Sequence, residues 1–341
     1  MSQPATSSAP HSVTLIPGDG VGPDITAATR QVLEALGAPL TFSEYRGPYR
    51  DDATGQLPAA LDEQIRRQPL VLKGTTTLDD DHAAFTGLLR DTYDLYANVR
   101  PAWGVLPENR FGELDLVLIR ENTEGLYVGL EHYIPLGDDP HAVGEATGVI
   151  TREGCRRIAN FAFAYAARQQ RKRVTVVHKA NILKALTGLF LETVMESAQP
   201  YKTQYTIEDR IVDACAMQLV LNPTRFDMLV TTNMFGDILA DQLAGMVGGR
   251  PLAPGAIIGD TVAVFEPIHE AHPELAGKDV ANPTGMMLAA VMLLQHIDEQ
   301  ALASRLLAAV RAALKEPAER TPDLGGDASL TAFTASVIGN L

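Results

Sequence analysis

Short apolar runs recur along the chain and predict buried β-strands that alternate with helices. The first run, residues 13–16, is followed at once by Pro17-Gly18-Asp19-Gly20 and then, from about Asp24, by apolar residues at helical spacing. A strand, a glycine turn and a helix in this order open an α/β unit, so the pattern predicts an α/β protein. Further strands are expected at 70–73, 114–119, 174–178 and 228–232, and helices at 155–168, 183–198, 284–296 and 299–315.

The turn at residues 18–22 (GDGVG) does not match the Rossmann fingerprint. The pattern G-x-G-x-x-G requires glycine where Pro23 stands, and no acidic residue ends a second strand. A tight turn that starts a helix and a turn that contacts phosphate both remain open.

Composition narrows the class of protein. The 341 residues are 46% hydrophobic and 21% charged, enough for one or two substantial cores. No apolar run reaches the roughly 18–20 residues that span a bilayer, so no membrane partner is expected. Residues 1–12 lack the basic and apolar regions of a secretory signal and are expected to form a flexible leader. Two cysteines, Cys155 and Cys215, do not suggest a disulfide framework and suit a reducing cytoplasm.

The formal net charge of −14 argues against a nucleic-acid partner, because phosphate binding needs a basic face. It does not argue against a small anionic substrate, which responds to local arginines rather than to the total charge.

Asp237 and Asp241 are the first candidates for metal ligands. Their i, i+4 spacing places both carboxylates on one helical face, with Cβ atoms about 6 Å apart. Like charges at that distance repel, and hard oxygen donors suit Mg²⁺ or Mn²⁺. Asp213, at the end of another apolar stretch, is a candidate third ligand. Two solvated aspartates remain the alternative.

Three arginines follow apolar stretches and are candidates for binding carboxylates. Arg90, Arg100 and Arg120 lie within about thirty residues of one another. Arginine at the end of a buried element suits bidentate binding of a carboxylate, so the three together favour a polycarboxylate pocket. Surface ion pairs are the alternative for each residue taken singly.

Tyr127 and Lys179 are candidates for proton transfer. Tyr127 follows a polar turn after one predicted strand, and Lys179 ends another. Beside a divalent metal, nearby positive charge is expected to lower the pKa values of both groups.

Segments along nearly the whole chain, in order, resemble the β-decarboxylating dehydrogenases, the isocitrate/isopropylmalate dehydrogenase family. They are residues 15–24 (LIPGDGVGPD), 94–101 (DLYANVRP), 120–127 (RENTEGLY), 178–181 (HKAN), 212–213 (VD), 217–220 (MQLV), 233–241 (NMFGDILAD), 258–260 (IGD), 281–284 (ANPT) and 323–326 (DLGG).

The resemblance implies a two-domain α/β fold that is not a Rossmann fold, with the active site in the interdomain cleft of a homodimer. Residues 13–100 and 255–341 would form a large cofactor-binding domain, and residues 101–254 a small domain with the dimer interface. The implied roles are malate carboxylate binding by Arg90, Arg100 and Arg120, metal binding by Asp237, Asp241 and the partner's Asp213, and proton transfer by Tyr127 and the partner's Lys179.

The resemblance also implies NAD as the cofactor. Glu274 stands where NAD-linked members carry an acid, which accepts hydrogen bonds from ribose hydroxyls and repels a 2′-phosphate. Glu270 and His272 depart from the family pattern, which has glycine and alanine there, and crowd the loop near the adenosine. The cofactor-binding residues implied by the resemblance are Asn181, near the nicotinamide, and His269, Glu274, Leu275 and Asn282.

The segment before Arg90, where family members distinguish substrates, departs most from the pattern. Isocitrate enzymes carry S-x-N-x-x-L-R there, and this chain has Ala84 and Thr86 at the serine and asparagine positions. The leucines of isopropylmalate enzymes are out of register, and the homoisocitrate arginine is absent at about Gly87. The loop 75–82 holds three threonines and a histidine. Thr77 and Thr86 are therefore the candidate contacts to the side group, with a solvated loop as the alternative.

Residues 125–128 and 230–233 are nearest to the isocitrate/homoisocitrate branch. We therefore expect oxidative decarboxylation of a 3-substituted malate with a polar, anionic side group, resembling isocitrate or homoisocitrate, or a phosphonate analogue such as phosphonomethylmalate. Isopropylmalate, tartrate or D-malate is the second choice. A non-catalytic regulatory subunit remains open, although the residues whose loss would mark it, such as Tyr127 and Lys179, are present.

Overall fold

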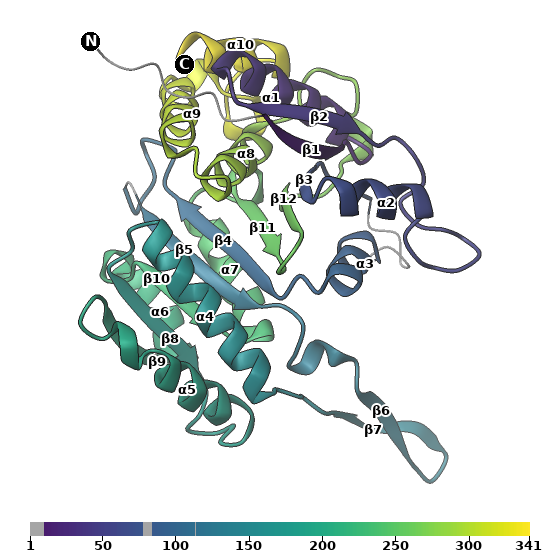
Figure 1. Cartoon of the computed structure of the whole chain (residues 1–341), viewed down its shortest axis with the longest axis vertical. Helices are drawn as coiled ribbons and strands as arrows, with labels where there is room; N and C mark the ends of the chain where they lie inside the picture. Colours follow the sequence, from purple (N-terminus) through teal and green to yellow (C-terminus); the bar gives the residue numbers. More distant parts are fainter. Residues whose placement is uncertain (1–9, 78–83, 113) are drawn as a thin grey trace.

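The computed structural model describes residues 10–77, 84–112 and 114–341, whose strands form one large sheet and one separate ribbon (Figure 1). The sheet has ten strands in the order β2-β1-β3-β12-β11-β4-β5-β10-β8-β9. Its strands are β1 (His11–Ile16), β2 (Leu40–Glu44), β3 (Leu70–Lys73), β4 (Ala97–Trp103), β5 (Asp115–Glu121), β8 (Arg173–His178), β9 (Thr206–Ile211), β10 (Met228–Thr231), β11 (Pro254–Ile258) and β12 (Ala263–Pro267).

The sheet changes direction at its centre. Strands β2, β1, β3 and β12 are mutually parallel, and so are β5, β10, β8 and β9. Between these blocks, β11 and β4 pair antiparallel with each other and with their outer neighbours. One sheet therefore joins two halves that run in opposite directions.

Helices cover both faces of this sheet and supply the packing that buries its strands. On one face α8 packs on β11 and β12, while α4 and α5 pack on β5, β10 and β8; on the other face α7 packs on β4 and β5, with α6 beside it. The helices are α1 (Gly22–Leu36), α2 (Ala59–Arg67), α3 (Ala84–Tyr93), α4 (Arg152–Arg168), α5 (Leu186–Ser197), α6 (Val212–Leu221), α7 (Asn233–Met246), α8 (Thr284–His296), α9 (Gln300–Ala313) and α10 (Leu330–Gly339).

The α/β prediction is confirmed, with local differences. The predicted strand 70–73 and helix 284–296 coincide with β3 and α8. Helix α5 begins at Leu186 rather than at 183. Strand β1 begins at His11, so the expected leader 1–12 is too long by at least its last two residues, which pair with β2. Residues 1–9 lie outside the described part of the chain.

The predicted division into a domain of residues 13–100 with 255–341 and a domain of residues 101–254 stays a prediction. The proposed boundaries fall within or beside β4 and β11, the two central strands of a continuous sheet.

The ribbon of β6 (Glu131–Leu136) and β7 (Asp139–Ala146) projects away from the rest of the molecule (Figure 1). Every residue of both strands is exposed, including large apolar side chains such as Tyr133 and Leu136, which are 62% and 63% exposed. A lone two-stranded ribbon is at most marginally stable in water, so this surface favours contact with another chain. No helix in the described part of the chain has the length and apolarity needed to cross a bilayer.

Candidate active site

Arg120, Asp237 and Tyr127 meet where β5 passes under the first turns of α7. The Arg120 guanidinium donates from Nε and Nη2 to Asn233 Oδ1, at 2.9 and 2.6 Å, and from Nη1 to Asp237. The Tyr127 hydroxyl donates to the other oxygen of Asp237. Arg120 is only 6% exposed, whereas Tyr127 is 46% exposed. A buried cation thus fixes a carboxylate that faces an accessible phenol.

Gly236 is what lets Arg120 pass beneath the helix. A Cβ atom built on Gly236 would lie 2.5 Å from Cγ of Arg120, closer than real side chains approach. The glycine in the segment 233–241 therefore has a packing role, which the sequence pattern did not reveal.

Within the chain alone, the pKa of Tyr127 is raised. Burial raises it first, and the hydrogen bond and charge of Asp237 raise it further, against the smaller effect of Arg120. The lowered pKa expected beside a divalent metal stays a prediction, and the sequence analysis did not identify the Asp237 carboxylate that accepts the hydrogen bond of the phenol. Tyr127 is therefore a protonated phenol at neutral pH, which suits a proton donor.

Arg100 and Arg90 lie close to Arg120. Burial lowers the pKa of Arg100, and the nearby charge of Arg120 lowers it further. Burial also lowers the pKa of Arg120, and the charge of Arg90 adds to that effect. Arg100 donates from Nε to Asn98 Oδ1 at 2.8 Å, while its buried Nη1 finds no partner in the described residues. Arg90 donates from Nε to Asp91 Oδ1 at 2.9 Å. Clustered guanidiniums with spare donors form a site for anionic oxygens.

Lys73 and Glu266 form a buried ion pair that the sequence analysis missed. Lys73 Nζ lies 2.8 Å from Glu266 Oε2, and the side chains are 3% and 7% exposed. The Thr86 hydroxyl is 3.3 Å from the same oxygen. Burial alone raises the pKa of Glu266, but the charges of Lys73 and Arg100 outweigh it and lower that pKa.

Arg250 is a second residue that the sequence analysis missed. It stands in the 3-10 turn Arg250–Leu252 after α7 and donates from Nη2 to Asp241 Oδ2 at 2.6 Å. Its Nη1 donates to Glu270, one of the two residues that depart from the family pattern. Asp241, a candidate metal ligand, is therefore held by a guanidinium in this chain.

A cavity of about 180 Å³ joins these groups. Its walls come from β3, α3, β4, the turn after α7, and the segment after β12. The residues lining it are Lys73, Thr75, Thr76, Thr86, Arg100, Arg250, Glu266, Pro267, Ile268, His269 and Glu270. Thr86, a predicted side-group contact, thus shares a wall with Arg100. Thr77, the other predicted contact, does not line it, and its amide and hydroxyl donate to Asp19 Oδ1 at 2.6 and 2.5 Å. His82 lies outside the described residues.

Lys179 and Asp213 form a separate pair. Lys179 Nζ donates to Asp213 Oδ1 at 2.6 Å, and this hydrogen bond lowers the pKa of Asp213. Within the residues described, no cluster of three histidine, cysteine or acidic side chains is close enough to hold a metal ion. One chain therefore does not bring Asp213 to Asp237 and Asp241, and the predicted site is divided into two parts.

The predicted cofactor residues lie on three segments. His269, Glu274 and Leu275 follow β12, where His272 Nδ1 lies 3.1 Å from Glu274 Oε1. Asn282 precedes α8 and donates to Asp323 Oδ2 at 2.9 Å. Asn181, beyond Lys179, is exposed and belongs to the other part of the site.

The glycine turn at residues 18–22 packs against the same loop. The Val21 amide donates to the Ala271 carbonyl at 2.7 Å, and Asp24 accepts from the Gly277 amide at 2.7 Å. The turn thereby supports the candidate cofactor loop.

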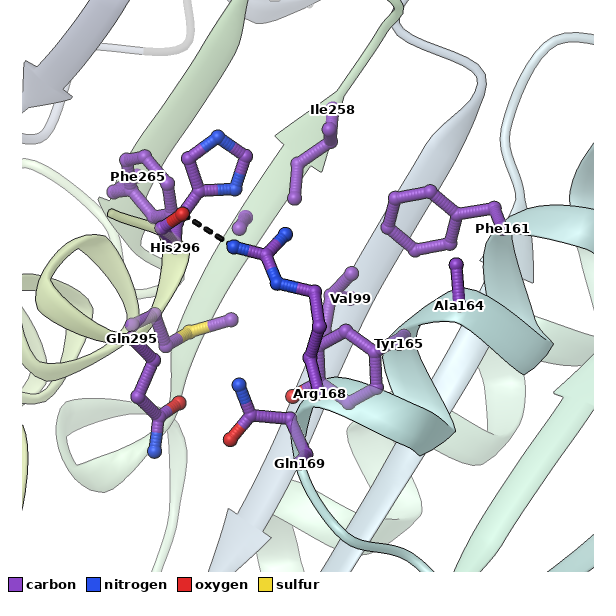
Figure 2. A pocket seen from close by; sticks show the side chains of 12 residues that line it. Val99, Phe161, Ala164, Tyr165, Arg168, Gln169, Ile258, Phe265, Gln295 and His296 are labelled. Carbon is purple, nitrogen blue, oxygen red and sulfur yellow. Dashed lines mark hydrogen bonds between the residues drawn. The ribbon is translucent and has the colours of Figure 1, made fainter. Parts of the chain in front are cut away.

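Figure 2 shows a second cavity, of about 110 Å³, on the opposite face of the sheet between α4 and α8. Phe161, Ile258 and Phe265 contribute to a largely apolar wall, and Arg168 reaches across to donate to the His296 carbonyl. Burial lowers the pKa of His296 to about 4. None of the predicted site residues lines this cavity, so it is distinct from the candidate active site.

Comparison with known proteins agrees with this arrangement. A family model described as isocitrate/isopropylmalate dehydrogenase matches residues 12–340. The chain is 44% identical to an isocitrate/homoisocitrate dehydrogenase of Thermus thermophilus, over 96% of this chain and 98% of that protein. It is 40% identical to a mitochondrial NAD isocitrate dehydrogenase catalytic subunit of Arabidopsis thaliana, over 98% and 90%.

A solved structure gives the same result. The isocitrate dehydrogenase of Methylococcus capsulatus superposes with a TM-score of 0.86 at 43% identity, covering 97% of this chain and 99% of that one. The chain belongs to the isocitrate/isopropylmalate dehydrogenase family.

Proposed function

We propose that this protein is an NAD-dependent, divalent-metal-dependent dehydrogenase that oxidises and decarboxylates a 3-substituted malate. The relatives named above, which are isocitrate and homoisocitrate dehydrogenases, support oxidative decarboxylation of a hydroxy acid. The observation that carries the proposal is the contact of Tyr127 and Arg120 with the two oxygens of Asp237. It joins a proton donor, an anion-binding cation and a candidate metal ligand at one point.

The residues present suit both cofactors. Asp237, Asp241 and a partner's Asp213 offer the hard oxygen donors that Mg²⁺ and Mn²⁺ prefer. Bound there, either ion would act as a Lewis acid on the substrate's C2 oxygen. Glu274 would accept hydrogen bonds from the ribose hydroxyls of NAD⁺, which would supply the hydride acceptor for C2.

The protein's own groups then have distinct tasks. Arg90, Arg100 and Arg120 hold the malate carboxylates: Arg100 lines the cavity with an unpartnered Nη1 among the described residues, and the charges of Arg120 and Arg90 lie close to it. Tyr127 protonates C3 after CO₂ leaves, because its accessible hydroxyl is a hydrogen-bond donor beside Asp237. A partner's Lys179 is the base side of the relay.

A homodimer is part of the proposal. Exposed apolar side chains lie beside both parts of the site: Ile182 after Lys179, Met217 one turn from Asp213, and Ile238 beside Asp237. A second copy covering these surfaces would bury them and join each Lys179–Asp213 pair to the other chain's Asp237 and Asp241. The exposed ribbon β6–β7 supports the same assembly.

The side group is proposed to be polar and anionic, as in isocitrate, homoisocitrate or a phosphonate such as phosphonomethylmalate. Three threonines, two arginines and Lys73 line the cavity together with Glu266 and Glu270, and this polar environment suits an isopropyl group poorly. Isopropylmalate, tartrate and D-malate are the second choice.

We retain the cytoplasm as the proposed location, since Cys155 and Cys215 are both free and buried.

One observation favours a non-catalytic regulatory subunit rather than an enzyme. Arg250 holds Asp241 as a cation would, which fits a regulatory subunit that has lost its metal. The intact set of Tyr127, Lys179 and the three aspartates favours the enzyme instead.

The test follows NADH formation with Mg²⁺ or Mn²⁺ against malate, tartrate, isopropylmalate, isocitrate, homoisocitrate and phosphonomethylmalate. NAD⁺ and NADP⁺ run in parallel, with Asp237→Asn as the inactive reference. We expect metal-dependent turnover of an anionic 3-substituted malate with NAD⁺. A folded dimer that binds Mn²⁺ yet turns over none of these acids would contradict the proposal.

A further inference from the structure

Arg250 occupies the wall of the cavity that also holds Arg100 and Thr86. Its side chain is 46% exposed, as is that of Glu270, and the side chain of Asp241 is 53% exposed. Ion pairs this open to water hold their partners weakly, so the guanidinium can exchange one anion for another at little cost.

The other two basic side chains that line the cavity, Lys73 and Arg100, already have an ion-pair partner or a proposed role. Lys73 is buried against Glu266 and neutralised by it. Arg100 is anchored by Asn98, and its unpartnered Nη1 serves the malate carboxylates in the proposed reaction. Arg250 alone among them is held by a carboxylate that the reaction needs elsewhere.

That carboxylate is Asp241. Its carboxylate cannot accept the hydrogen bond of Arg250 Nη2 and bind a divalent cation in the same position, and the two positive charges repel each other. Glu270 would still hold Nη1 and keep the guanidinium at the cavity wall. The freed edge of Arg250 would then face the cavity beside Thr86, with donors that suit a carboxylate or a phosphonate.

We propose that Arg250 is the residue that recognises an anionic group on the substrate's C3 substituent, and that divalent-cation binding at Asp241 releases it for that task. Glu270 is the positioning residue for Arg250. This inference rests on the proposed function and names its substrate class. It also links the cation to the side group, so each strengthens binding of the other.

The first arm of the test measures Mn²⁺ binding calorimetrically to the full-length protein without substrate or NAD. Because Arg250→Met removes the competitor for Asp241, we expect it to bind Mn²⁺ about two- to fivefold more tightly than the wild type. Arg30→Met, which breaks a similarly exposed pair with Glu34 on α1, is the matched control and should leave Mn²⁺ affinity unchanged. Equal or weaker Mn²⁺ binding by Arg250→Met would overturn the exchange.

The second arm compares kcat/KM for the anionic 3-substituted malates with that for D-malate, which has no C3 substituent. Arg250→Met should lose about ten- to hundredfold with the anionic substrates and little with D-malate. Arg250→Lys keeps the charge and should lose less, which covers the case in which Arg250→Met fails to fold. An equal loss on both substrate classes, or no loss on either, would overturn the recognition role.

The proposed function and the role of Arg250 can be contradicted separately. If the wild type turns over no substrate, the proposed function fails, and the Mn²⁺ titration still decides whether Arg250 competes for Asp241. If the wild type is active and Arg250→Met has the same ratio of kcat/KM for the anionic substrates to kcat/KM for D-malate as the wild type, only this inference fails.

Discussion

Tyr127 and Asp237 share a hydrogen bond in which the phenol donates to a carboxylate oxygen, while Arg120 binds the other oxygen of the same carboxylate. The acid that we assign to the reaction and a carboxylate that we assign to the metal are thus linked within one chain. What happens to one group must therefore alter the other.

The first prediction concerns the pKa of Tyr127. Asp237→Asn removes the charge that helps to raise this pKa, so the pKa should fall, although burial still keeps it above that of free tyrosine. The measurement is a difference titration of phenolate absorbance between Asp237→Asn and a double variant that also carries Tyr127→Phe. A titration midpoint equal to or above that of the wild type would show that Asp237 does not act on Tyr127.

The buried pair of Lys73 and Glu266 gives a stability prediction. Lys73→Met leaves a carboxylate buried without its cation and should lower the free energy of unfolding at neutral pH by about 3–5 kcal/mol. Adding Glu266→Gln should recover much of that loss. Urea unfolding measures both, and Arg67→Met is the surface control, with an expected effect of at most about 0.5 kcal/mol.

The same pair gives a pH dependence whose sign is fixed. The pKa of Glu266 is lowered in the folded protein, so the pair's contribution is present above the unfolded pKa and is lost as pH falls through the folded pKa. In Lys73→Met the pKa should rise instead, so the deficit relative to the wild type should shrink on acidification. If the loss of unfolding free energy in Lys73→Met did not change with pH, the unpaired charge of Glu266 would not be its cause.

Mixing two inactive variants tests the shared site. Tyr127→Phe and Lys179→Met should each be nearly inactive, because each dimer would lack one group at both sites. Exchange of subunits should produce mixed dimers with one complete site, restoring about a quarter of wild-type activity if assembly is random. No recovery, in a mixture proven to contain mixed dimers, would mean that Tyr127 and Lys179 act within one chain.

Cofactor choice can be tested at Glu274. Glu274→Lys should lower kcat/KM for NAD⁺ and raise it for NADP⁺, because a lysine attracts the 2′-phosphate that a carboxylate repels. The variant also breaks the contact with His272, so His272→Ala serves as the matched control. Similar changes in both variants would assign the effect to the loop rather than to the charge at position 274.

The sequence predicted those helices and strands whose pattern of apolar residues lies within a short stretch of the chain. Helix α8 follows from its continuous apolar run. Helix α7 was not among the predicted helices, although the placing of Asp237 and Asp241 on one helical face assumed it. Strand β7 (DPHAVGEA) was missed because all its residues are exposed and it lacks the alternation of a half-buried strand. The roles of Tyr127 and Lys179 came from the resemblance, not from spacing alone.

Two contacts missed at the site join residues that are distant in the chain, whereas Arg250, also missed, lies only nine residues from Asp241. Glu266 lies 193 residues from Lys73, and Asp237 lies 110 residues from Tyr127. No periodicity within a window of sequence reports such a pair. For that reason neither the contact of Tyr127 with Asp237 nor the Lys73–Glu266 pair was predicted.

The place of β12 between β3 and β11 has a consequence for the order of folding during synthesis. Strand β3 leaves the ribosome early, yet the strand that pairs with its open edge is made almost two hundred residues later. The middle of the chain, from β5 to β10, pairs mostly with itself and can fold first. The N-terminal strands must wait with an unpaired edge, so the nascent chain is most open to misassembly or chaperone binding there.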